Sequence, residues 1–272
     1  MTTQRPDPTL GNSEWLVGFA DYFDACRPSP PPVILDILTQ LAQTTYPHLV
    51  VDLGCGTGLS VNIWADRAKN VIGIDNGYEM LQRAKLRTGS KNVSYVYGLA
   101  TQTGLADSCA DIVTCSQSLH WMNPAEIFRE VCRILHPNGV FAAYDFDWPP
   151  TTDNWEAETA LNSLMARVFT LEKERRYSTG FKRWDKTQHL DRMRDSGYFR
   201  YTKEILVHHV EIGNAERLIG LALSHSFIAA FLRKGLNKAE LGLDNFESTI
   251  KRTLGSEPKP WYFSYRLRLG IV

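Results

Sequence analysis

The stretch VVDLGCGTG, residues 50–58, decides the fold of this chain. Three glycines, Gly54, Gly56 and Gly58, follow an apolar run that is rich in β-branched residues and contains one acid, Asp52. A short apolar run ended by glycines predicts a buried strand, and a glycine-rich turn after such a strand is typical of a nucleotide site. The question is which nucleotide this turn binds.

The spacing of the glycines and the position of Asp52 argue against a dinucleotide. The pattern G-x-G-x-x-G, counted from Gly54, needs a glycine where Leu59 stands. Asp52 lies at the carboxyl end of the strand, where it would repel a pyrophosphate and favour a ligand with ammonium and sulfonium groups. S-adenosylmethionine carries both cations, and its carboxylate can meet the backbone N–H groups of the glycine loop.

A second acid, Asp75, ends the next apolar run, NVIGID at 70–75. A carboxylate at the end of the second strand can accept hydrogen bonds from both ribose hydroxyls. NAD sites share this feature, so Asp75 supports a nucleoside without choosing one. The structural alternative for Asp75 is the cap of the following helix.

Strands and helices alternate through the middle of the chain, which predicts an α/β fold with a Rossmann-like, doubly wound parallel sheet and helices on both faces. Five strands are expected, at 48–53, 70–75, 93–98, 111–117 and 140–146. A sixth is expected at 202–212 and a seventh at 260–271, where large apolar side chains alternate with polar ones.

We interpret residues 1–272 as a single domain whose cofactor-binding core spans 48–147. The segments 148–200 and 213–258 show helical spacing. In the second segment we expect one long helix at 214–234 and another at about 237–254. Inside the core we expect a helix at 59–68. We expect the two segments to be helical insertions that form a substrate lid over the carboxyl ends of the strands, where ligands bind in such sheets.

The bulk composition narrows the class of partner. The chain has 30 basic and 30 acidic side chains, so it lacks the positive field that draws proteins to nucleic acid or anionic membranes. Five cysteines without a C-x-x-C pair, and histidines without H-E-x-x-H spacing, predict reduced thiols and no metal site. No apolar run of 18 residues and no signal peptide is visible, so we expect a cytoplasmic protein with a small-molecule substrate.

Five stretches in order resemble the class I S-adenosylmethionine-dependent methyltransferases, in the branch that contains the ubiquinone-biosynthesis and trans-aconitate enzymes. They are ADYFDACRPSPP, VVDLGCGTG, VIGIDNGYEML, GLATQTGLADSCADIVTCSQSLHW and EVCRILHPNGVFAAYD. The strong likeness covers residues 48–147. It implies a seven-stranded sheet whose last strand is antiparallel to the rest, and S-adenosyl-L-methionine as the cofactor.

The resemblance also implies which residues form the site. It places a cofactor-binding set at Asp52, Gly54, Cys55, Gly56, Gly58, Asp75, Asn76, Met80, Leu99, Ala100, Thr101 and Ser116. The family often has an acid after the third strand, where this chain has Leu99, so adenine recognition is expected to use backbone groups and the Thr101 hydroxyl. The N-terminal signature contributes Tyr22 and Arg27 as substrate candidates.

Three further residues are candidates on the acceptor side. His120 and Trp121 follow the fourth strand, where loops carry function, and relatives of the trans-aconitate type have the same pair. We predict that Trp121 walls the acceptor pocket and that His120 hydrogen-bonds the acceptor or takes its proton. The alternative is plain packing. His225 lies on an apolar stripe, so a core role competes with a role in the substrate pocket.

Two other classes remain open at the level of sequence. One is a non-catalytic protein that binds S-adenosylmethionine, and the other is an NAD-dependent oxidoreductase, which Asp52 and the glycine spacing disfavour. For the methyltransferase, the sulfonium activates the methyl group, and the protein aligns the acceptor for in-line displacement. A carboxylate or hydroxyl oxygen is the acceptor that we favour.

Overall fold

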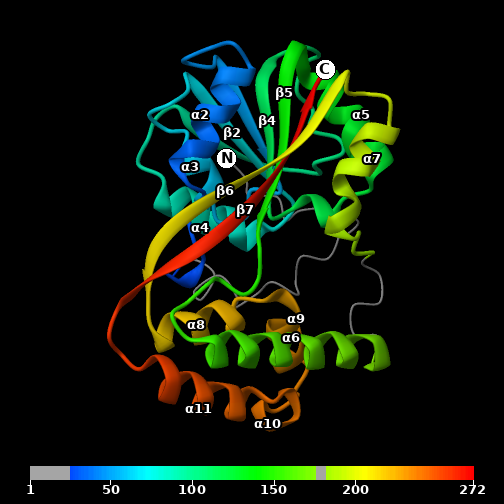
Figure 1. Cartoon of the computed structure of the whole chain (residues 1–272). Coiled ribbons are helices and arrows are strands. Elements are labelled where there is room, and N and C mark those ends of the chain that lie inside the picture. The colour runs from blue at the N-terminus through cyan, green and yellow to red at the C-terminus, as the bar shows by residue number, and fades with distance from the viewer. Residues whose placement is uncertain (1–24, 176–181) are drawn as a thin grey trace.

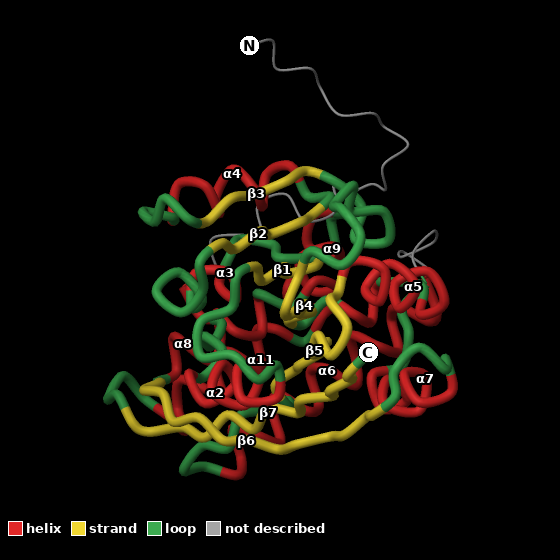
Figure 2. Tube along the Cα trace, turned by 90° about the horizontal axis from the view of Figure 1, so that it is seen from above, coloured by secondary structure: helices red, strands yellow, loops and turns green. Residues whose placement is uncertain are grey.

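The computed structural model describes residues 25–175 and 182–272, and it has the expected α/β architecture. A seven-stranded sheet runs in the order β3-β2-β1-β4-β5-β7-β6 (Figures 1 and 2). Its strands are β1 (Leu49–Leu53), β2 (Asn70–Asp75), β3 (Val93–Tyr97), β4 (Ala110–Ser116), β5 (Leu135–Phe146), β6 (Tyr201–Gly213) and β7 (Lys259–Ile271). The first five strands are parallel, and β7 runs antiparallel to both of its neighbours, so the predicted sheet is confirmed.

Helices cover both faces of the sheet. On one side lie α2 (Pro32–Leu41), α3 (Leu59–Asn62) and α4 (Tyr78–Arg87), and on the other lie α5 (Pro124–Ile134) and α7 (His189–Asp195) (Figure 1). Buried side chains of β1, β4 and β5 alternate between these two layers, as Val50 and Val51 do. The central parallel strands β1, β4 and β5 are therefore buried on both faces, as their continuous apolar sequence predicts.

The remaining helices form a cap at one end of the sheet. They are α6 (Trp155–Arg175), α8 (Ala215–Leu223), α9 (Ser226–Arg233), α10 (Lys238–Leu241) and α11 (Leu243–Leu254). Helix α6 packs on α9, α10 and α11, and Figure 1 shows the whole group below the sheet. The short helix α7 instead contacts β6, β7 and α5, so the segment 148–200 is divided between the cap and the side of the sheet.

Three predicted helices are shorter than the sequence suggested. The helix expected over 214–234 breaks into α8 and α9, because His225 adopts an extended backbone and its ring Nδ1 accepts a hydrogen bond from the Phe227 N–H. The helix expected over 237–254 is divided at Gly242, which has a left-handed backbone. The helix expected over 59–68 ends at Asn62 and continues as turns.

In the last strand, β7, the side chains that the sequence assigns to the apolar face are buried, as predicted. Trp261, Phe263, Tyr265, Leu267 and Leu269 are each at most 1% exposed. On the other face Arg268 is also buried, which the alternation did not predict. Its guanidinium meets the Asp145 carboxylate of β5 at 3.1 Å, so an ion pair is built into this part of the sheet.

Candidate active site

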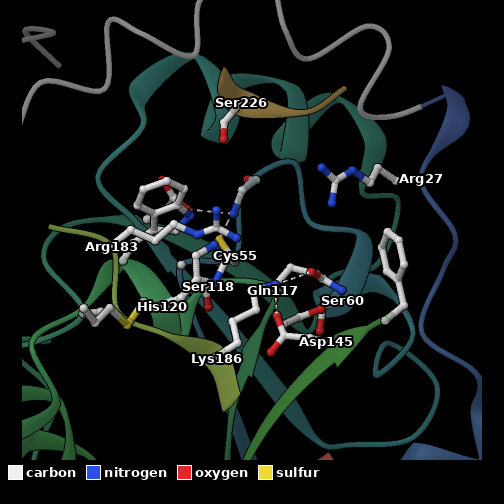
Figure 3. A pocket seen from close by; sticks show the side chains of 18 of the residues that line it. Arg27, Cys55, Ser60, Gln117, Ser118, His120, Asp145, Arg183, Lys186 and Ser226 are labelled. Carbon is white, nitrogen blue, oxygen red and sulfur yellow. Dashed lines mark hydrogen bonds and ion pairs between the residues drawn. The ribbon is translucent and has the colours of Figure 1, made fainter. Parts of the chain in front are cut away.

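A cavity of about 790 Å3 lies between the carboxyl ends of the parallel strands and the cap. Its walls come from the loops after β1, β2, β3, β4 and β5, from α6, and from the start of α9. Figure 3 shows side chains from these segments converging on the pocket. The position agrees with the general rule that ligands of open α/β sheets bind outside the carboxyl ends of the strands.

The glycine loop forms one wall, and each of its three glycines has a positive φ. A side chain at Gly54 would come within 2.6 Å of the Ser118 Cβ, so this glycine is required by packing. A Cβ at Gly56 would meet only the Met80 methyl group, at 3.5 Å, so the space beside Gly56 belongs to the cavity. A ligand can therefore approach the backbone closely at Gly56.

Asp75 lines the same wall and is held by backbone donors. Its Oδ2 accepts a hydrogen bond from the Gly56 N–H at 2.8 Å, and its Oδ1 accepts one from the Gly77 N–H at 2.6 Å. Burial raises the pKa of this carboxyl, although the two backbone hydrogen bonds oppose the rise. Each oxygen keeps a second lone pair, so the carboxylate can still accept from hydroxyl groups of a ligand.

The segment after β3 forms the neighbouring wall. Leu99, Ala100 and Thr101 line the cavity together with Asn76 and Met80. The Gly98 N–H donates to the Asp75 carbonyl oxygen, which ties this segment to β2. Glu126, at the start of α5, also lines the cavity and was not predicted, although its place in the first turn of a helix after β4 could have pointed to it.

Two residues of the predicted cofactor set, Asp52 and Gly58, do not line the cavity. Asp52 is fully buried on β1, where its Oδ1 accepts a hydrogen bond from the Thr114 hydroxyl at 2.6 Å. Burial raises its pKa to about 7, and its Oδ2 has no hydrogen-bond partner among the described residues. Gly58 begins α3 under Tyr95, whose hydroxyl occupies the space that a side chain would need. Both residues thus support the loop from behind.

His120 and Trp121 lie in a short 3-10 helix (Leu119–Trp121) directly after β4, and both line the cavity. The His120 side chain is buried, and its Nδ1 has no hydrogen-bond partner in the described part of the chain. Burial, with added repulsion from Lys186 and Arg183, holds the pKa of His120 well below its usual value. The imidazole is therefore neutral at physiological pH.

Comparison with known proteins shows which family has this glycine loop and this fold. Residues 51–143 match the family described as "Methyltransferase domain". An uncharacterized methyltransferase from Synechocystis is 32% identical over 152 residues, which are 48% of this chain and 71% of that protein. The chain belongs to the class I S-adenosylmethionine-dependent methyltransferases.

Other relatives of this methyltransferase extend the match. An uncharacterized methyltransferase-like protein from Schizosaccharomyces pombe is 28% identical over 88% of this chain and 87% of its own. A structure from Anaeromyxobacter dehalogenans, assigned as a type II methyltransferase, superposes with a TM-score of 0.61 at 19% identity and covers 91% of this chain and 98% of its own. The chain spans about half the length of several further relatives, such as 48% and 53% of two of them.

Two of the three predicted substrate residues of the methyltransferase, Arg27 and His225, line the cavity. Arg27 donates to the Ser224 hydroxyl at 2.8 Å and lies over the rings of Phe146 and Trp148. The ring of His225 lies 5.7 Å from that of Trp148 and also lines the cavity. Burial lowers the pKa of His225 well below its usual value. Tyr22 lies outside the described residues.

A charged cluster at the floor of the cavity was missed by the sequence reasoning. The Lys186 ammonium meets the Asp145 carboxylate at 2.5 Å and donates to the Gln117 side-chain oxygen at 3.1 Å (Figure 3). Burial alone would raise the pKa of Asp145, but Lys186 and Arg268 lower it below its usual value. Nothing local in 182–188 predicts this contact, because tertiary folding alone brings that segment under β5.

No three His, Cys, Asp or Glu side chains of the described ranges come together as metal ligands. No single helix within those ranges has the length and apolar character to cross a membrane, and the pair α8 and α9, which bends by 71°, passes that test only when the two are taken together.

Proposed function

We propose that the protein transfers a methyl group from S-adenosylmethionine to an oxygen atom of a small-molecule acceptor. One observation carries the proposal. A single cavity of about 790 Å3 has Gly56 and Asp75 on one wall and His120, Trp121 and Arg27 on another, so it offers room for a cofactor and an acceptor side by side. The volume falls in the usual range of ligand pockets, about 300–1,000 Å3.

The glycine-loop wall fits the cofactor. The open space beside Gly56 allows close approach to the backbone, and the free lone pairs of Asp75 suit the two ribose hydroxyls. Leu99, Ala100 and Thr101 line the same part of the cavity, which supports adenine recognition by the backbone of Leu99 and Ala100 and by the Thr101 hydroxyl. When bound, the cofactor supplies a methyl group that its sulfonium has already activated.

The chain's own residues have to orient the acceptor and keep water away. Trp121 and Phe169 line the cavity, and both meet the buried Phe227 edge to face, so Trp121 and Phe169 give the acceptor side an apolar wall. Such a wall can hold an acceptor oxygen at a reactive separation of about 3–3.5 Å from the methyl carbon. His120, which is neutral, can hydrogen-bond the acceptor or take a proton from a hydroxyl, whereas a carboxylate needs no base.

The balance of charge and the cysteines support the rest of the assignment. The equal numbers of acidic and basic side chains favour a small molecule over nucleic acid as the substrate. All five cysteines are free thiols, which supports work in a reducing compartment such as the cytoplasm.

The test is a methyl-transfer assay with isotope-labelled S-adenosylmethionine and a small-molecule extract, read out as a mass gain of one methyl group. The wild-type protein should label a low-molecular-weight compound, and at a cofactor concentration near the wild-type Kd the Asp75→Ala variant should label much less of it. Tight binding of S-adenosylhomocysteine without any labelled product would favour a non-catalytic binding protein. Preferential binding of NADH would contradict the proposal.

A further inference from the structure

Arg183 extends into the acceptor side of the cavity and is surrounded by aromatic rings. Its guanidinium carbon lies 5.4 Å from the centre of the Phe169 ring, 5.7 Å from that of Phe227 and 5.9 Å from that of Trp121. The residue lines the cavity and remains exposed, so a ligand can reach it. Figure 3 shows Arg183 and Arg27 entering the pocket from opposite sides.

Three other cations that line the cavity, Lys186, Arg266 and Arg268, have carboxylate partners. Lys186 and Arg268 share Asp145, and Arg266 pairs with Asp147, while Glu204 lies within 3.3 Å of both arginines of β7. These three cations and three carboxylates balance each other in charge. Within the described part of the chain, Arg183 forms no such ion pair, and its five N–H donors are available.

A second observation marks the same part of the cavity as a place for a polar ligand. The His120 side chain is 5% exposed, and its Nδ1 lacks a partner among the described residues. A buried polar atom without a partner is costly in a folded protein, and the imidazole that carries this atom lines the cavity, where a polar ligand group can interact with the ring. His120 packs against Trp121, which is also one of the rings below Arg183.

We propose that Arg183 anchors the acceptor and that the acceptor is an organic carboxylate with a flat, apolar body. This inference rests on the proposed function. The carboxylate forms paired hydrogen bonds with the planar guanidinium, and the body packs against Trp121 and Phe169, the two of these rings that line the cavity. The charge of Arg183 is matched by one negative charge, whereas a phosphate monoester carries about 1.5–2 at neutral pH. A monoanion is therefore the better fit.

The experiment measures binding to the protein saturated with S-adenosylhomocysteine. The probes are benzoate, trans-cinnamate and sorbate, each paired with its neutral amide, and phenyl phosphate. For at least one pair, wild-type protein should bind the acid roughly ten- to a hundredfold more tightly than the amide, the range for charge-assisted hydrogen bonds. Arg183→Met should bring that ratio close to one, and Arg183→Lys should retain part of it.

Two controls show whether the acid preference depends on the Arg183 side chain itself. Arg194→Met removes the same charge from an exposed ion pair with Asp191 on α7, and it should keep the wild-type ratio. The affinity for S-adenosylhomocysteine, measured by calorimetry, should stay within about twofold in Arg183→Met, since the cofactor lies on the other wall. Thermal unfolding of each variant confirms that it is folded.

Several results would overturn the assignment of Arg183. They are an acid preference that survives in Arg183→Met, equal affinity of the wild type for acid and amide in every pair, and tighter binding of phenyl phosphate than of any carboxylate. Loss of S-adenosylhomocysteine affinity in Arg183→Met would move the residue to the cofactor. Failure of the wild type to bind S-adenosylhomocysteine would instead overturn the proposed function, and this inference with it.

Discussion

Replacing Asp75 tests how the cofactor's ribose is held. The carboxylate accepts N–H groups of Gly56 and Gly77 at 2.8 and 2.6 Å, and its remaining lone pairs face the cavity. Asp75→Ala removes the charge-assisted hydrogen bonds to the ribose, with a net loss of about 1.5–3 kcal/mol in all, so affinity should fall roughly ten- to a hundredfold. Asp75→Asn should also weaken binding, because its NH2 group would face one of the two N–H donors.

The assay is calorimetric titration with S-adenosylhomocysteine, with thermal unfolding measured in parallel. Asp75→Ala leaves two N–H groups facing a cavity that water can enter, so the loss of stability should be about 1–2 kcal/mol. Asp36→Ala is the matched control, because Asp36 forms an exposed ion pair with Arg67 and neither residue lines the cavity, so this variant should bind normally. Affinity within twofold of wild type in a folded Asp75→Ala protein would refute the ribose assignment.

Three other changes test the two walls and their support. Gly56→Val should abolish binding of S-adenosylhomocysteine and lower the free energy of unfolding by about 1–2 kcal/mol. The control is Gly197→Val, at an exposed glycine with φ of +71°, which should lower stability equally and leave binding, measured by calorimetry, intact. His120→Ala should keep cofactor affinity and reduce methyl transfer to the true acceptor, and wild-type turnover would return His120 to a packing role. Asp52 has a folded pKa of about 7 against an ordinary value of 3.8, so the folded state binds the proton more tightly and the free energy of unfolding should fall as pH rises between these values. Asp52→Asn should remove that slope in chemical denaturation, and an unchanged slope would show that another group causes it.

The sequence predicts most of the sheet because its strands are marked locally. Short apolar runs that end at glycine or acid, such as the one before Gly54 and the one that ends at Asp75, need no knowledge of distant contacts. The antiparallel β7 is also marked, since its side chains alternate between buried and exposed faces over the first part of the strand. These local patterns fix the strand positions and, with the right-handed crossover rule, most of the topology.

The acceptor side is harder to predict because its residues meet only through tertiary folding. Arg183 and Lys186 belong to a segment without periodicity, yet they reach the cavity beside residues of β4 and β5. The apolar stripe of 214–234 continues across the break at His225, so the sequence pattern gives no sign that a new helix begins there. The N-cap of that helix depends on one ring nitrogen of His225. Asp52 shows the opposite case, because its position at the strand end predicts ligand contact, while its side chain is fully buried and does not line the cavity.

A crystal structure of the complex with S-adenosylhomocysteine tests the central claim most directly, that one cavity holds cofactor and acceptor on separate walls. We predict that the ribose hydroxyls contact the Asp75 carboxylate, that the amino-acid end follows the loop at Gly56, and that the space between His120 and Arg183 stays free for the acceptor. A ligand that fills this space, or one whose ribose does not touch Asp75, would contradict the account.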